Sequence, residues 1–101
     1  MATTTKALFR GAATTTLTTT LYTVPASTTT VVTNIAVANT AATAATFDIS
    51  LDGVKLFDAV AIAADSTAFI DLKQVLATTK IIAGGASAIT VNFHISGVEI
   101  V

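Results

Sequence analysis

The sequence predicts an all-β protein: an antiparallel β-sandwich, jelly-roll-like or immunoglobulin-like, with about seven or eight short strands. Apolar and polar residues alternate with a period of two along several segments, which is typical of half-buried strands. Turn residues separate these segments at intervals of roughly ten residues, and no segment has a convincing amphipathic helical period. Threonine, a β-branched residue, occurs 21 times among 101 residues and favours extended chain.

The first part of the chain predicts an extended arm followed by a Thr-rich strand. We expect residues 1–16 to form a Thr-rich N-terminal arm and residues 17–101 to form the β-sandwich domain. The strand enters the core at Leu17, Leu21 and Tyr22. It ends before Pro25, because proline cannot donate a hydrogen bond to a sheet ladder.

The middle of the chain predicts three further strands. One covers residues 29–39, and a second covers residues 45–51, where apolar residues alternate strictly with polar ones. Asp52-Gly53 then predicts a type I′ hairpin turn, since both central positions of that turn need positive φ. The returning strand covers residues 54–58.

The last part of the chain predicts three short strands, at residues 67–72, 80–83 and 89–95. A single helical turn is expected over residues 71–76, with Asp71 as its N-cap. Gly84-Gly85 predicts a turn, and Gly97 predicts a bulge or the end of pairing.

The apolar strand positions predict the hydrophobic core, and the aspartates are expected to keep strand faces and turns solvated. Those aspartates are Asp48, Asp52, Asp58, Asp65 and Asp71. The predicted core comprises Leu17, Leu21, Val31, Ile35, Val37, Phe47, Ile49, Leu51, Leu56, Ile62, Phe69, Ile70, Leu72, Leu76, Ile82, Ile89, Val91, Phe93 and Ile95.

Composition narrows the classes of function. The chain is 52% hydrophobic but only 11% charged, and its net charge is −1. No apolar run reaches the roughly 18 residues of a transmembrane helix, and residues 1–10 lack the apolar region of a signal peptide, so we expect no membrane insertion. The five basic residues are dispersed, so we expect no nucleic-acid partner. So few charges predict a surface that is covered by neighbouring subunits.

No constellation of catalytic or ligand-binding residues stands out. Residues 48–53 match the start of an EF-hand calcium loop, but position twelve is Ala59 rather than a bidentate glutamate, so a hairpin is favoured. Cysteine is absent and His94 is the only histidine, so one chain offers no thiolate or multi-histidine metal site. Symmetric copies of His94 around an axis are the minor alternative. We expect no enzyme, no cofactor and no metal.

Two long segments resemble small virion-associated proteins of tailed bacteriophages. In Leu21–Val54, "LYTVPASTTTVVTNIAVANT" is similar to the family's "YTVPAGTT" strand end and its "VVTNIVVTNT" strand, and an "L-DG" hairpin follows. In Ala61–Ile100, the closing "VNFHISGVE" is similar to the family's "VNVHVSGVE". The chain departs from the pattern at Ser27, where glycine is usual, and at Thr78-Thr79-Lys80, where a Gly-Asp turn is missing.

The resemblance implies a non-enzymatic structural protein of the virion with a β-sandwich fold. The leading expectation is decoration or cementing of the capsid surface through symmetric oligomer contacts, with a trimer as one candidate state. Ala7, Leu8, Phe9 and Arg10 on the N-terminal arm are the candidate assembly contacts. The partners would be further copies of the chain and the major capsid protein or tail proteins, in a virion assembled in the host cytoplasm. Two alternatives stay open: a tail, collar or fibre accessory subunit that contacts the tail or a host receptor, and a carbohydrate- or ligand-binding β-sandwich module.

Overall fold

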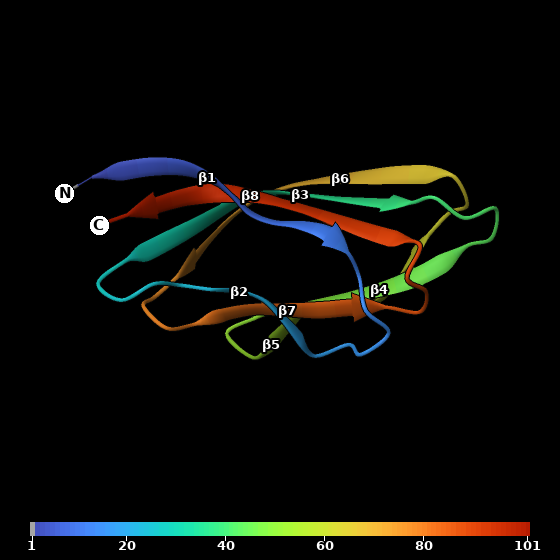
Figure 1. The fold of residues 1–101 in the computed structure, drawn as a ribbon, viewed down its shortest axis with the longest axis horizontal. Coiled ribbons are helices and arrows are strands. Elements are labelled where there is room, and N and C mark those ends of the chain that lie inside the picture. Colours follow the sequence, from blue (N-terminus) through green and yellow to red (C-terminus); the bar gives the residue numbers. More distant parts are fainter. Residues whose placement is uncertain (1) are drawn as a thin grey trace.

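A computed structural model describes residues 2–101 as two four-stranded antiparallel sheets packed face to face (Figure 1). No helix in this part of the chain is long and apolar enough to cross a membrane. The strands are β1 (Thr3–Ala12), β2 (Thr19–Thr23), β3 (Thr29–Asn39), β4 (Ala45–Leu51), β5 (Val54–Ile62), β6 (Ser66–Leu76), β7 (Ile81–Ala86) and β8 (Val91–Ile100).

The strand order is that of a jelly roll. One sheet has the order β1-β8-β3-β6 and the other β2-β7-β4-β5, and the two layers are separate in Figure 1. The strand pairs are β1 with β8, β2 with β7, β3 with β6 and β4 with β5. This nested pairing is that of a long antiparallel hairpin folded into two sheets. The predicted β-sandwich is confirmed, and of its two variants the jelly-roll-like one is observed.

The core lies between the two sheets and is built from the alternating strands. Phe47 and Ile49 of β4 face Phe93 and Ile95 of β8, and all four side chains are at most 1% exposed. The rings of Phe47 and Phe93 meet edge to face with centroids 6.1 Å apart. The inward positions predicted at Phe47, Ile49, Phe93 and Ile95 are therefore confirmed.

Four residues of the predicted core are exposed instead: Leu17, Leu56, Phe69 and Ile89. Leu17 and Ile89 lie in loops. Leu56 is on an edge strand, at a shift in the pairing with β4. Phe69 and Ile70 are consecutive in a strand, so they point to opposite faces, and the half-buried Ile70 is the inward one.

Several predicted elements were also wrong. Residues 71–76 belong to β6 rather than to a helical turn, and Gly84-Gly85 lies inside β7 rather than in a turn. A Cβ on Gly84 would collide with the backbone of Asp48, so glycine is used there for close strand approach. The Asp52-Gly53 turn is confirmed, with φ values of 55° and 74°.

The extended N-terminal arm is not confirmed. Thr3–Ala12 is strand β1, which pairs with β8 from Thr3 opposite Ile100 to Ala12 opposite Asn92. The pairing shifts by one residue at Leu8, and this bulge turns the Leu8 side chain into the core, where it is 7% exposed. Residues 2–12 therefore belong to the folded sandwich.

Gly97 lies inside β8, beside pairing shifts in both neighbouring strands. The extra residues are Leu8 in β1 and Thr33 in β3, so the predicted irregularity near Gly97 is present but is located in its neighbours. A Cβ on Gly97 would collide with the carbonyl oxygen of Val31 and lie 2.8 Å from Leu8 Cδ1. Only glycine lets the strands pass this closely.

Candidate assembly surface

The four residues predicted as assembly contacts do not form one exposed patch. Leu8 is buried and Phe9 packs against the core, so these two side chains stabilise the chain's own fold. Ala7 and Arg10 are exposed, and Arg10 lies opposite His94 on the outer face of the sheet. Of the four residues, only Ala7 and Arg10 are open to contact a partner.

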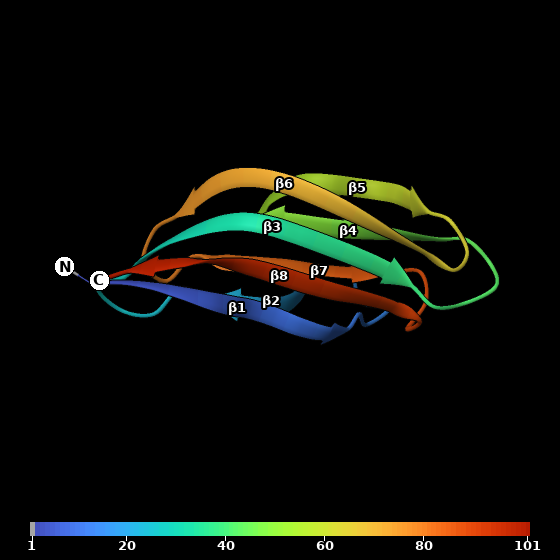
Figure 2. The same cartoon turned by 90° about the horizontal axis from the view of Figure 1, so that it is seen from above.

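The most exposed apolar surface lies instead on one side of the sandwich, along the edge strands β5 and β6. We call this surface the β5–β6 edge (Figure 2). Each of the two strands has a neighbour on one side only. Five large apolar side chains are exposed there: Val54, Leu56 and Val60 on β5, and Phe69 and Val75 on β6.

Three of these residues are at least 68% exposed, and one of them is Val54 of β5. Phe69 is 75% exposed and Val75 is 68% exposed, and both lie on the outer face of β6. The consecutive apolar residues Phe69 and Ile70 indicate that one of them is exposed, because two consecutive strand residues cannot both enter the core. The other exposed residues of the β5–β6 edge could not be predicted, since the sequence does not show which strands lie at sheet edges.

Between Phe69 and Val75, the outer face of β6 carries one acidic and one basic residue. Asp71 accepts a hydrogen bond from Asn34 Nδ2 at 3.2 Å. Among residues 2–101, Lys73 takes part in no ion pair, whereas Lys6, Lys55 and Lys80 each lie within 4 Å of a carboxylate. With Thr33 and Leu72, these two residues line a shallow depression.

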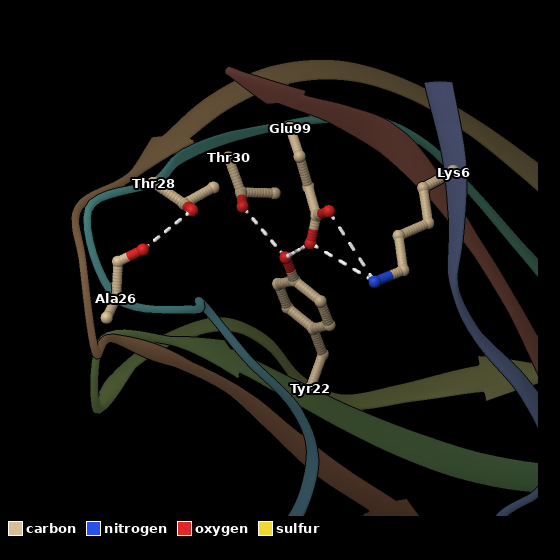
Figure 3. A network of polar contacts seen from close by, with 6 residues as sticks. All are labelled: Lys6, Tyr22, Ala26, Thr28, Thr30 and Glu99. Carbon is tan, nitrogen blue, oxygen red and sulfur yellow. Dashed lines mark hydrogen bonds and ion pairs between the residues drawn. The ribbon is translucent and has the colours of Figure 1, made fainter. Parts of the chain in front are cut away.

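A polar network joins the two sheets at the end of the sandwich where the termini lie (Figure 3). The Tyr22 hydroxyl donates to Glu99 Oε2 and lies 2.9 Å from Thr30 Oγ1, and Lys6 Nζ lies 3.3 Å from the same Glu99 oxygen. Burial, followed by the bond to Glu99, raises the pKa of Tyr22 to about 12. The bond from Tyr22 lowers the pKa of Glu99, against the effect of burial.

Asp48 forms a second polar contact, at the bulge between β4 and β5. It was expected to be solvated, but it is 4% exposed. Its carboxylate accepts a hydrogen bond from the Ala59 backbone N–H at 3.0 Å and pairs with Lys55. The bond from Lys55 lowers the pKa of Asp48, and the same contact raises the pKa of Lys55. Asp48 thus satisfies a backbone group that the bulge leaves without a ladder partner.

At the opposite end of the sandwich, the buried Asn39 ties several loops together. Its amide nitrogen donates to the carbonyl oxygens of Thr43 and Ala63, at 2.8 and 3.3 Å. Its amide oxygen accepts from the Ala41 backbone N–H and from Thr90 Oγ1. Every buried side-chain polar atom of residues 2–101 has a hydrogen-bond partner, so these polar groups stabilise the fold.

The remaining candidate features lie apart from one another. His94 is half-buried on the outer face of β8, between Arg10 of β1 and Ala36 of β3. Across residues 2–101 no three histidine, aspartate or glutamate side chains gather as metal ligands would. Of the six aromatic residues only Phe69 is exposed, so they form no aromatic platform.

Comparison with protein-family models, with curated proteins and with solved structures finds no match to this chain.

Proposed function

We propose that this chain is a non-enzymatic structural protein of a tailed-bacteriophage particle that decorates the capsid surface as a symmetric oligomer. The observation that carries the proposal is the β5–β6 edge. Large apolar side chains that stay exposed on a folded protein favour a partner, and open strand edges invite pairing with another chain. The particle context comes from the resemblance carried by residues 21–100.

The mechanism we propose is geometric. Residues 2–101 form one jelly roll, which presents a preformed edge and loses little conformational freedom on docking. With 11% charged residues, the chain has few groups for long-range steering, so affinity would come from apolar burial and close fit. Symmetric contacts would then link several weak attachments to the shell into one strong attachment.

Attachment to the tail or collar remains the alternative within the same class, because the same edge serves either location. A carbohydrate-binding module is disfavoured by the aromatic residues. Glycan sites usually present aromatic faces, whereas Tyr22, Phe47 and Phe93 are buried here and Phe69 stands alone.

The test is attachment of the purified protein to phage particles that lack it, followed by electron microscopy. We expect density spread over the shell. A double variant, Phe69→Ser with Val75→Ser, should weaken attachment roughly ten-fold or more, because it removes apolar area and multivalency. Ile89→Ser is the matched control, since Ile89 is 67% exposed but lies away from the edge.

Each outcome separates the candidates. Density confined to the tail would favour the tail accessory role. Absence of the wild-type protein from every part of the particle would overturn the proposal. If the edge variant and Ile89→Ser lose attachment equally, the β5–β6 edge is not the attachment surface.

A further inference from the structure

The outer face of β6 has a self-complementary pattern. The odd-numbered residues from Phe69 to Val75 on this face are apolar, acidic, basic and apolar: Phe69, Asp71, Lys73 and Val75; Gln74 is exposed as well. Leu72 stands at the centre of this series, with two of the four residues on each side. Exposed and half-buried residues alternate from Thr67 to Lys73, and beyond the shift in the β3–β6 pairing Gln74 and Val75 are both exposed.

We infer that two copies of this chain pair through their β6 strands, antiparallel, about a two-fold axis that passes at Leu72. This inference deepens the proposed function, on which it rests for its place in a particle, by naming the partner and the register. Leu72 lies opposite Leu72 of the second copy, Asp71 opposite Lys73, and Phe69 opposite Val75. A two-fold contact repeats each of the last two pairs, so it contains two ion pairs and two apolar pairs.

The charges select this register over its neighbours. Facing residues in an antiparallel pair lie on the same side of the sheet, so only even shifts keep the outer faces together. A shift of two residues in one direction places Asp71 opposite Asp71, and in the other direction it places Lys73 opposite Lys73. Like charges directly opposite each other are unfavourable, so the Leu72-centred register is the complementary one.

The surroundings of β6 fit a second copy of the chain. β6 borders β3 on one side only, so its other side carries backbone groups with no strand beside them. Lys73 has no ion-pair partner within residues 2–101, and the two-fold contact supplies one. β5, which carries the exposed Leu56 and Val60, lies on the same side of the sandwich as β6 (Figure 2).

Charge reversal and rescue test the pairing. Sedimentation equilibrium of the purified full chain should give a dimer, and Lys73→Asp should raise the dimer dissociation constant roughly ten-fold or more, because it places acids opposite acids. The double variant Asp71→Lys with Lys73→Asp exchanges the charges and should restore dimerisation. Thr23→Asp on β2, an exposed position on another strand, is the control and should leave the mass unchanged.

Cysteine cross-linking gives a second, independent readout, and the natural chain has no cysteine to interfere. Leu72→Cys places two thiols opposite each other at the axis, within the roughly 4.4–6.8 Å between Cα atoms that a disulfide allows. We expect oxidation to cross-link this variant into a dimer. Ile70→Cys, also half-buried and inward, should not cross-link, because the two copies of residue 70 lie roughly 13 Å apart along the strands.

The results also separate this inference from the function it deepens. A monomeric or trimeric wild-type protein, or cross-linking at residue 70 as readily as at residue 72, would overturn the two-fold pairing. Failure of the double variant to restore dimerisation would overturn its register. If such a protein still attaches to particles, the proposed function stands without the pairing. A dimer with the expected register that does not attach to particles would overturn the function alone.

Discussion

At the scale of single residues, the buried polar side chains join strands that are distant in sequence. Tyr22 of β2 contacts Glu99 of β8 across the two sheets, and Asp48 of β4 holds the backbone of β5. The tyrosine was assigned to the core from the sequence, together with its neighbour Leu21, and it is buried. Asp48 could not, because strict alternation assigns it to the solvent face, and only the bulge in the neighbouring strand buries it.

Tyr22→Phe should destabilise the protein by about 1–3 kcal/mol, because Glu99 and Thr30 each lose a buried partner. The pH dependence is more specific. Folding raises the pKa of Tyr22 from 10.0 to about 12, so this stabilisation is complete below pH 10 and is lost as the pH rises through about 12. The shift corresponds to a decline of roughly 2–3 kcal/mol, which the variant should lack. Urea unfolding at pH 8–12 measures both effects, and identical alkaline profiles would contradict the assignment.

Asp48→Ala should cost roughly 1–3 kcal/mol, since the part-buried Ala59 N–H would lose its charged acceptor. Asp48→Asn keeps an acceptor oxygen and should cost less. Folding lowers the pKa of Asp48, so its stabilisation is present above the ordinary pKa of an aspartate and is lost as the pH falls through the lower value of the folded state. Thermal unfolding between pH 7 and pH 2 should therefore show a smaller acid loss in Asp48→Asn than in the wild type.

Gly97→Ala should destabilise by about 1–3 kcal/mol, because the added Cβ overlaps the backbone of β3 and the Leu8 side chain. Gly11→Ala is the matched control in the same sheet, since its Cβ would meet only the Phe9 ring, at 3.5 Å. Chemical denaturation of both variants provides the comparison. Equal losses of stability would show that the crowding at Gly97 is not the cause.

At the scale of elements, predictability followed the strength of the alternation. The strand ending at Leu51 and its hairpin were predicted because Phe47, Ile49 and Leu51 alternate with polar residues and Asp-Gly suits the turn. β1 was assigned to an arm because Thr3–Ala12 alternates weakly, and its place depends on the distant β8. Gly84-Gly85 suggested a turn because glycine is common in turns, and a close approach between strands cannot be seen in one sequence.

Deleting residues 2–12 tests whether β1 belongs to the fold. The deletion exposes the edge of β8 and removes Leu8 and Phe9 from the core, so we expect a loss of roughly 3 kcal/mol or more, with partial unfolding. Circular dichroism melting curves give the readout. Removing residues 2–4 alone, which are exposed, should have a much smaller effect. An arm outside the fold would leave both melting temperatures at the wild-type value.

At the scale of the whole molecule, the jelly-roll order makes most pairing non-local. β1 must find β8 across nearly the whole chain, and β2 must find β7. The sandwich class could be predicted from strand number and spacing. The strand order could not, because several pairings satisfy the same alternation. The β5–β6 edge follows from that strand order, so it could not be predicted from the sequence either.

Non-local topology should make folding slow. We expect refolding on the millisecond-to-second scale rather than in microseconds, since distant strands must meet before any sheet is complete. The only tyrosine, Tyr22, is buried, and the chain has no tryptophan, so stopped-flow tyrosine fluorescence reports on the joining of the two sheets. The experiment uses dilute protein, so that association between chains does not contribute to the fluorescence trace. A microsecond phase that recovers the full amplitude would contradict this expectation.

The backbone of residue 2 and that of residue 101 exchange two hydrogen bonds, from Ala2 N to Val101 O and from Val101 N to Ala2 O, of 3.0 and 2.8 Å. Topologically, the described chain is thus a loop that is closed by hydrogen bonds. A short covalent link between these residues would make it a ring, and the ring could be reopened at the exposed Asp52-Gly53 turn without removing a strand. Anything fused at either end would emerge from this closure, where β1 and β8 run side by side.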